Sequence, residues 1–334
     1  MTYTEILSAT PLLGTMQILP LLTGLILIRV RGEAALALAG VASGAGLLVA
    51  ISLYLRFDSH QPAGVMQFAE QFPILGAFHY HAAVDGMGVL FILLSSLLGL
   101  LSVAYIVVRK LHESSILAAM MMIQATVISQ FVTVDMLWFT LMSLIEVLLI
   151  AYITKRWGTA HDIQPTLSRF LQFMGVGLLL LGFGTLLLGW TYADTHNGRW
   201  SFSLYELVQL QFVSKDIIGT LIFFSLFYGL GIRIPVFPLH GWLPSFMSDG
   251  NTAVAPIYLL GLKVGIYGML RFVFPIVPEA VQEWHVIATI FAGSGVFYAA
   301  FLAMRQHTLR DMLAFAVISH TGILTIGMFS LHPM

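Results

Sequence analysis

The sequence contains no cysteine and few charged residues, and each absence excludes a class of protein. Without cysteine the chain forms no disulfide, thiolate metal site or iron–sulfur cluster, and it has no cysteine nucleophile. Charged residues make up 9% of the 334 residues, whereas a soluble domain carries about 25%. Hydrophobic residues make up 58%. A soluble fold could not cover its surface with so little charge, so the composition predicts a polytopic membrane protein.

Basic runs and a signal peptide are also lacking. The formal net charge is −1, and no basic stretch could follow a phosphate backbone, so nucleic acid is not an expected partner. The N-terminus, Met1 to Glu5, lacks the positive start of a cleaved signal peptide, which predicts that the first apolar stretch is a retained helix. We find no nucleotide-binding loop and no set of cofactor or metal ligands. Any catalysis is therefore expected to belong to partner subunits.

Apolar segments long enough to cross a membrane recur along the chain. A helix needs about 20 apolar residues to span the hydrocarbon. The sequence predicts ten such helices, the seventh discontinuous because prolines interrupt it. Two polar connections, 56–86 and 191–216, are expected to form surface hairpins or short interfacial helices. The predicted class is an all-α polytopic protein with one membrane domain over 1–334. The predicted helices are 10–28, 34–55, 87–108, 115–133, 136–154, 167–190, 217–247, 254–274, 284–304 and 312–331.

The basic residues of the loops predict an orientation. If the N-terminus is outside, nine Lys and Arg residues lie in inside loops and four, including Arg271, lie outside. The bias favours both termini on the outer side of the membrane.

Three ionisable residues, Glu146, Arg233 and Lys263, interrupt apolar segments. A charge at mid-membrane costs at least ~2.5–3.5 kcal/mol, so such residues usually face a partner or a water-filled cavity. They could form a proton relay, because burial and neighbours shift the pKa of Glu and Lys. They could equally form static ion pairs that hold helices together.

Prolines and histidines suggest where a relay could run. Pro235 and Pro238 each remove a backbone donor from the seventh segment, and discontinuous helices of this kind surround ion paths in transporters. His240 lies at this break. It could pass protons, or it could form hydrogen bonds with the backbone groups that the break leaves free. His320, in the tenth segment, could relay protons or form an interhelical hydrogen bond.

Smaller polar and glycine residues have simpler interpretations. Four polar residues could line a water-filled path, but interhelical hydrogen bonds are the simpler interpretation. These residues are Thr126, Ser129, Gln130 and Thr140. Gly175, Gly177, Gly182 and Gly184 are expected to allow close helix packing. His79 and His81 would share one face of a strand, but the further ligands of a metal site are missing.

Several sequence motifs resemble the antiporter-like membrane subunits of respiratory complex I. The strongest is the run from Arg233 to Pro244, which contains Pro-Leu-His-Gly-Trp-Leu-Pro and is followed by Lys263 to Phe272. His81 to Gly88 and Ser319 to Gly322 add weaker matches. The resemblance covers about residues 75–330, is closest to the NuoM type, and extends to Mrp antiporters and membrane-bound hydrogenases.

The resemblance implies a proton-translocating subunit built from inverted five-helix repeats, in the bacterial inner membrane. It implies N-terminal helices over 1–114, one complete repeat over 115–274 (helices 4–8) and a truncated second repeat over 275–334. Carried onto this chain, the family's fifth-helix Glu is Glu146, its seventh-helix Lys position is Arg233, and its eighth-helix Lys is Lys263. His240 and His320 match family histidines.

The chain departs from the family pattern at several points. Arginine stands where the family has the seventh-helix Lys, and a guanidinium does not release a proton. Glu146 follows Asp135 by eleven residues, two more than in the family. Two residues are about 200° of helix rotation, so Glu146 would need a bulge in its helix to face Arg233. The family has about fourteen helices, so the missing half-channel is expected on another chain.

Three functions follow from the sequence. The first is a proton-translocating subunit of a complex I-like or antiport assembly, with other membrane subunits and peripheral redox subunits as partners. The second is the membrane subunit of an inorganic-carbon uptake complex, paired with a carbonic-anhydrase-like zinc protein. The third is a structural membrane anchor whose channel has decayed.

Overall fold

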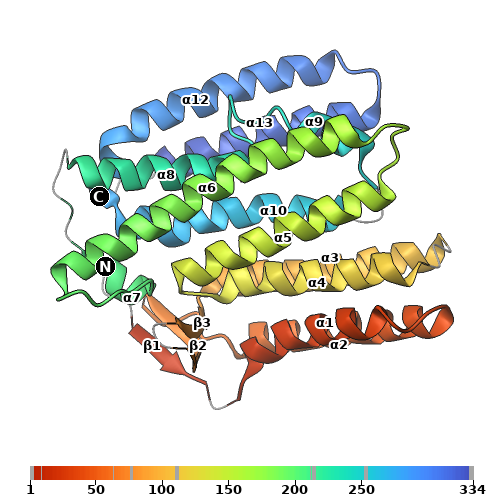
Figure 1. The fold of residues 1–334 in the computed structure, drawn as a ribbon, viewed down its shortest axis with the longest axis horizontal. Helices are drawn as coiled ribbons and strands as arrows, with labels where there is room; N and C mark the ends of the chain where they lie inside the picture. Colours follow the sequence, from red (N-terminus) through yellow and green to blue (C-terminus); the bar gives the residue numbers. More distant parts are fainter. Residues whose placement is uncertain are drawn as a thin grey trace. The chain divides into compact units, whose positions relative to one another are not determined.

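The computed structural model describes residues 4–8, 10–62, 64–75, 78–109, 113–210, 212, 216–251 and 255–330. Figure 1 shows the helices and the small three-stranded sheet of the chain. The chain forms two compact units. The first contains residues 1–153 and 252–260, and the second contains 154–251 and 261–334.

Helices α1 to α5 build the first unit around the buried helix α4. Residues of α4 from Ile116 to Val132 are almost all buried, because α4 packs against α1 and α3. Its polar residues Gln124, Thr126 and Gln130 thereby avoid lipid. Asp85 caps α3, where its Oδ1 accepts the N–H of Gly88 at 2.8 Å. The helices are α1 (Leu12–Leu27), α2 (Glu33–Arg56), α3 (Gly86–Val108), α4 (Ser114–Val132) and α5 (Met136–Trp157).

A small sheet joins the N-terminus to the connection between α2 and α3. Strand β1 (Thr4–Leu7) pairs in parallel with β2 (Val65–Leu75), which pairs antiparallel with β3 (Phe78–Val84). The hairpin is one of the two forms expected for 56–86. The all-α description is therefore correct for the membrane helices but omits this sheet, because the short strand β1 has too little sequence pattern of its own.

The second unit contains a long helix, several short ones and a terminal helical hairpin. Helix α6 packs against α8, and α12 packs against α13. Helix α10 continues without a break through the π-helical turn η1 into α11. The helices are α6 (Gln164–Thr195), α7 (Leu204–Leu207), α8 (Ile217–Arg233), α9 (Leu243–Asp249), α10 (Ala255–Gly268), η1 (Met269–Val273), α11 (Phe274–Ile276), α12 (Pro278–Met304) and α13 (Leu309–Ser330).

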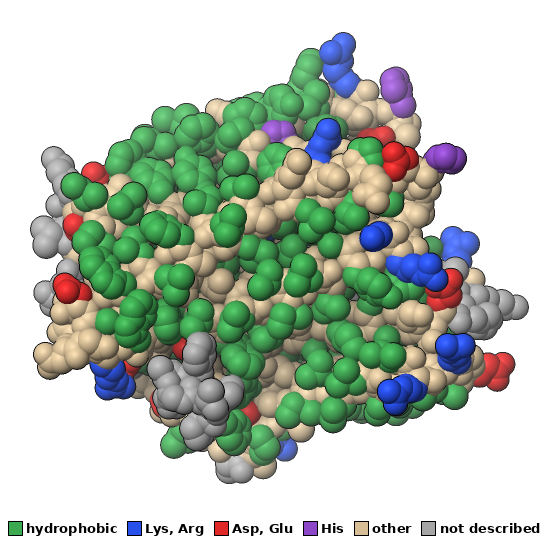
Figure 2. Space-filling view, in the orientation of Figure 1, with side chains coloured by type: hydrophobic (Ala, Val, Ile, Leu, Met, Phe, Trp, Pro, Cys, Tyr) green, Lys and Arg blue, Asp and Glu red, His purple; other side chains and the backbone are tan. Residues whose placement is uncertain are grey.

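The helices fit a multi-pass membrane protein. Seven helices of the described chain are long and apolar enough to cross a membrane, and α1 and α8 are shorter apolar helices. Figure 2 shows hydrophobic side chains over the sides of the helices, with most charged side chains at helix ends. Each predicted apolar segment coincides with a helix or, for 217–247 and 254–274, with consecutive helices. Residues 331 and 254, at the ends of two predicted segments, lie outside the described part.

Glycines bring α6 and α8 into close contact. A Cβ at Gly177 would lie 3.1 Å from the carbonyl oxygen of Gly229, and one at Gly184 would lie 2.7 Å from Leu226 Cδ2. The packing role predicted for these two glycines is therefore confirmed. It is wrong for Gly175 and Gly182, where a Cβ would meet nothing within 4 Å, because those residues face away from α8.

Candidate functional site

Glu146 lies in the middle of α5 with none of its surface exposed. Asp135 begins this helix by accepting the N–H of Trp138 at 2.7 Å. Gln130 Nε2, on α4, donates to Glu146 Oε2 at 2.7 Å. Ser143 Oγ, one turn before Glu146, donates to Gln130 Oε1 at 2.8 Å. The serine thus orients the amide so that its N–H faces the carboxyl group.

Three further polar residues of α4 and α5, Ser129, Thr126 and Thr140, form hydrogen bonds between the helices or within them. Ser129 Oγ accepts the indole N–H of Trp138 at 2.8 Å, which links α4 to α5. Thr126 and Thr140 donate to carbonyls of their own helices, at 2.8 and 2.9 Å. Gln130 and Ser129 therefore form the interhelical hydrogen bonds that the sequence favoured.

Helix α5 is α-helical throughout Met136–Trp157, so it contains no bulge at Glu146. The carboxyl group faces Gln130 within the first unit. Arg233 belongs to the second unit, and the predicted interaction between Glu146 and Arg233 stays a prediction.

Helix α8 ends at Arg233, and turns connect it to α9 at Leu243. Pro235 cannot donate to the carbonyl of Gly231, and Val236 N–H takes its place at 3.1 Å. This shift deprives the carbonyl of Ile232 of its regular donor. The indole N–H of Trp242 fills that position at 3.0 Å. The break is thus closed by a side chain whose role the sequence motif did not reveal.

Arg233 is 5% exposed and contacts α10 on either side of Lys263. Its Nη2 donates to the carbonyl of Gly261 at 3.4 Å, and a Cβ at Gly265 would lie 3.2 Å from Arg233 Cβ. Residues 261 and 265 therefore face α8. Lys263 is two positions from each, about 200° around the helix. Its side chain therefore leaves α10 on the side opposite to the one that Arg233 contacts.

His240 lies at the break, and His320 lies elsewhere. The His240 ring is 8% exposed and packs between Phe237, at 5.5 Å, and Tyr298 of α12, at 5.3 Å. Its Nδ1 is buried and has no hydrogen-bond partner within the described residues. His320, on α13, is exposed. The structure therefore does not bring His320 into the buried group around the break.

Arg271 is a buried cation near the end of the predicted segment 254–274, and it was counted among the basic residues of the outer side. It is 3% exposed and lies in η1. Pro275, four residues later, has no N–H for the Arg271 carbonyl, which accounts for a π-turn here. Arg271 Nε donates to Tyr267 Oη at 3.0 Å, and the guanidinium lies over the Tyr267 ring at 5.1 Å. The helix predicted over this stretch is thus present, and the π-turn keeps the guanidinium buried against Tyr267.

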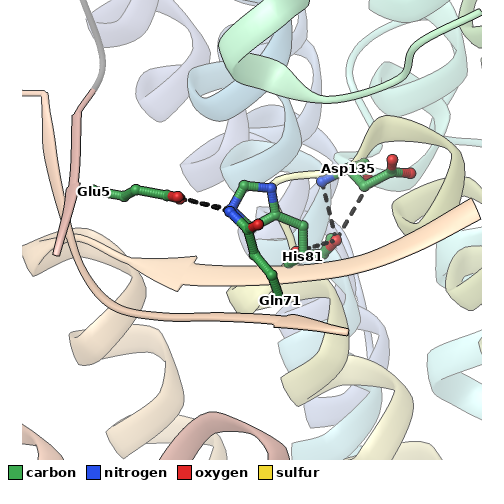
Figure 3. Close-up of polar contacts among 5 residues, drawn as sticks. Glu5, Gln71, His81 and Asp135 are labelled. Atoms are coloured by element: carbon green, nitrogen blue, oxygen red, sulfur yellow. Dashed lines mark hydrogen bonds and ion pairs between the residues drawn. The ribbon is translucent and has the colours of Figure 1, made fainter. Parts of the chain in front are cut away.

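The sheet carries a separate polar cluster, shown in Figure 3. His81 Nε2 on β3 lies 2.7 Å from Glu5 Oε2 on β1, and Gln71 Nε2 on β2 donates to Glu5 Oε1 at 2.7 Å. The side chain of His79 lies outside the described residues. No group of three His, Asp or Glu residues suited to a metal ion occurs in the described part of the chain.

Comparison with known proteins identifies the family. The family model described as "NADH:quinone oxidoreductase/Mrp antiporter, TM" matches residues 136–332, which is more than half of the chain. The chain belongs to this family. All five predicted site residues, Glu146, Arg233, His240, Lys263 and His320, lie within the matched range.

Curated relatives agree with this assignment. NADH-quinone oxidoreductase subunit M of Escherichia coli K12 is 30% identical over 302 residues, which are 85% of this chain and 58% of that protein. F(420)H(2) dehydrogenase subunit M of Methanosarcina mazei is 29% identical over 82% of this chain and 56% of that protein. The chain thus spans little more than half the length of these relatives.

Solved structures share the fold. A chain of respiratory complex I from Thermus thermophilus with bound NADH has a TM-score of 0.81 at 23% identity and covers 95% of this chain and 64% of its own. A chain of the archaeal membrane-bound sulfane sulfur reductase has a TM-score of 0.77 at 20% identity and covers 95% of this chain and 51% of its own. The predicted resemblance to antiporter-like subunits is confirmed.

Proposed function

We propose that the chain is a proton-translocating, antiporter-like subunit of a multisubunit, complex I-like assembly. The observation that carries the proposal is Glu146, a carboxyl group with no exposed surface in the middle of an apolar helix, which accepts a hydrogen bond from an amide of the preceding helix α4. A carboxyl group is costly at that depth. A hydrogen-bonded carboxyl that can gain and lose a proton is what a proton path requires.

Each of the other buried groups has a role that follows from its chemistry. Lys263 is a titratable amine on the side of α10 away from Arg233. Arg233 keeps its charge, so it acts as a fixed cation that biases titratable neighbours. His240 lies at the backbone break, where its Nδ1 can accept a hydrogen bond from water. His320 faces outward from α13 and joins a path only where a partner subunit covers that face.

The localisation and partners extend the same proposal. We place the chain in the bacterial inner membrane with both termini on the outer side, from the distribution of Lys and Arg. The named relatives are subunits of NADH-quinone oxidoreductase and F(420)H(2) dehydrogenase. Their names support other membrane subunits and peripheral redox subunits as partners.

Proton flux in vesicles that contain the purified assembly tests the proposal. We expect Glu146→Gln and Lys263→Met each to reduce flux at least about tenfold, because each removes a titratable group. Glu33→Gln and Lys155→Met make the same chemical changes at exposed residues of α2 and α5 and should leave flux unchanged. Normal flux in both buried variants would contradict proton transport through this chain and favour a structural anchor.

Purification from mild detergent separates the two kinds of assembly. Co-purifying flavin or iron–sulfur subunits are expected for the complex I-like assembly. A co-purifying carbonic-anhydrase-like zinc protein in their place would support the inorganic-carbon uptake complex.

A further inference from the structure

A small cavity lies in the first unit where α1, α2, α3 and α4 meet. Its polar lining comes from Ser43, Ser96 and Gln124, each near the middle of an apolar helix. The cavity therefore lies near mid-membrane depth, away from bulk water. The centre of a water molecule can occupy about 10 Å³ of this cavity, which is about enough room for one water.

Two polar atoms at this cavity lack a protein partner. Ser96 Oγ and Gln124 Oε1 are buried and form no hydrogen bond with any described residue. The Gln124 amide lies directly against Gly99 of α3, where an added Cβ would be 2.5 Å from it. The amide therefore cannot move further toward α3. Buried polar groups in proteins are nearly always paired with protein or ordered water. Since no residue of the described part pairs these two atoms, water is the expected partner.

Helix α1 contributes a further acceptor. Pro20 lies inside α1 and has no N–H for the carbonyl of Met16. Both Met16 and Pro20 line the cavity. Proline is tolerated in membrane helices partly because ordered water satisfies the carbonyl that it frees. The residues that line the cavity thus carry a serine hydroxyl, an amide oxygen and a backbone carbonyl without its helical donor, and about three such partners are usual for a buried water.

We propose that this cavity is a binding site for an ordered water molecule that joins α1, α3 and α4. The water donates to Gln124 Oε1 and to the Met16 carbonyl, and it accepts from the Ser96 hydroxyl. No ionisable side chain lines the cavity, so its ligand is neutral water and neither a metal cation nor a stored proton. The site is separate from Glu146 and does not depend on proton transport.

X-ray radiolysis of the assembly in detergent, followed by mass spectrometry, tests this site. Radiolysis turns a bound water into a hydroxyl radical that oxidises the side chain beside it. Met121 lines the cavity and Met120 does not, although the two are 1% and 0% exposed. We expect Met121 to oxidise at least about threefold faster than Met120. Equal rates in the wild-type chain would overturn the proposal without any substitution.

A double variant assigns the water to its partners. Ser96→Ala with Gln124→Leu removes both polar side chains that lack a partner, and the Met121 rate is expected to fall to that of Met120. Ser225→Ala, in the second unit, removes a hydroxyl that bonds its own helix and should change neither rate. An unchanged Met121 rate in the folded double variant would show that these residues do not hold the water.

Discussion

The buried charges of α5 and α8 are accommodated in different ways. Glu146 lies in a regular helix whose backbone N–H groups are already used, so a side-chain amide from α4 supplies its hydrogen bond. Arg233 lies at the last residue of α8, and it donates to a backbone carbonyl of α10. A side-chain acceptor in the middle of a helix needs a side-chain donor, because the backbone N–H groups are already bonded. A side-chain donor can instead use a backbone carbonyl oxygen, which has a second lone pair.

This difference has a consequence for function. A carboxyl group is titratable in principle, and the amide of Gln130 that donates to Glu146 carries no charge. A guanidinium cannot change its state, so we propose that Arg233 has only an electrostatic role. The two helices therefore supply a titratable group and a fixed charge.

The largest expected effect concerns the fixed charge. Arg233→Met removes the cation and should reduce proton flux in vesicles at least about tenfold, because the bias on titratable groups is lost. Arg233→Lys keeps a cation at the same depth and should retain most of the flux. Equal flux in the two variants, at any level, would show that charge at this position is not what matters.

Removing the amide donor should cost stability. Gln130→Leu takes away the hydrogen bond to Glu146 Oε2 and should lower the free energy of unfolding by about 3 kcal/mol, because a buried carboxyl loses its donor. Unfolding in detergent measures the change. The second substitution Glu146→Leu, made in the same chain, should recover most of the loss. Gln282→Leu, at an exposed position of α12, is the matched control.

The backbone break should show a smaller effect. Trp242→Phe keeps the ring packed against Phe170 and Phe246 but leaves the Ile232 carbonyl without its indole donor. We expect a loss of about 1–2 kcal/mol in the free energy of unfolding. Trp284→Phe makes the same change where the indole N–H has no partner in the described residues and should cost less. A larger loss at Trp284 would contradict the closing role of Trp242.

The smallest expected effect concerns a carboxyl outside the membrane helices. Glu70 accepts the N–H groups of Leu13 and Gly14 at 2.7 and 2.8 Å. Burial nevertheless raises the pKa of Glu70 above its ordinary value of 4.5, and these two bonds only partly oppose it. The folded state therefore binds this proton more tightly than the unfolded state does. The stabilisation from the bound proton is complete below pH 4.5 and is lost as the pH rises through the folded pKa.

Thermal unfolding in detergent at a series of pH values measures this linkage. The wild-type midpoint should fall as pH rises above 4.5, on top of any other titration. Glu70→Gln should flatten that part of the curve. An unaltered curve would mean that the two backbone donors offset burial completely.

Much of the candidate site could be predicted from residue type and position. Glu146 and Arg233 stand out because ionisable residues are costly in apolar segments, and both are indeed buried. Pro235 marks the end of α8 because it cannot donate to the preceding turn. The partners could not be predicted. Ser143 and Trp242 act through geometry that depends on which helix faces they occupy.

Arg271 shows what a correctly predicted helix leaves open. It lies near the end of the predicted segment 254–274, and a π-turn keeps its guanidinium buried against Tyr267. Local sequence sets the missing hydrogen bond, but neighbouring helices decide whether the chain bends, widens or stops.

The length of the apolar segments and the cost of buried charge are properties of the residues alone, so they predict a bundle of membrane helices with a few ionisable residues at depth. The neighbours of those residues follow from the packing of the helices. Gln130 faces Glu146, Arg233 contacts the side of α10 opposite to Lys263, and His320 faces outward. Those outcomes depend on helix rotation. A rotation of 100° per residue turns a small difference in position into a different neighbour.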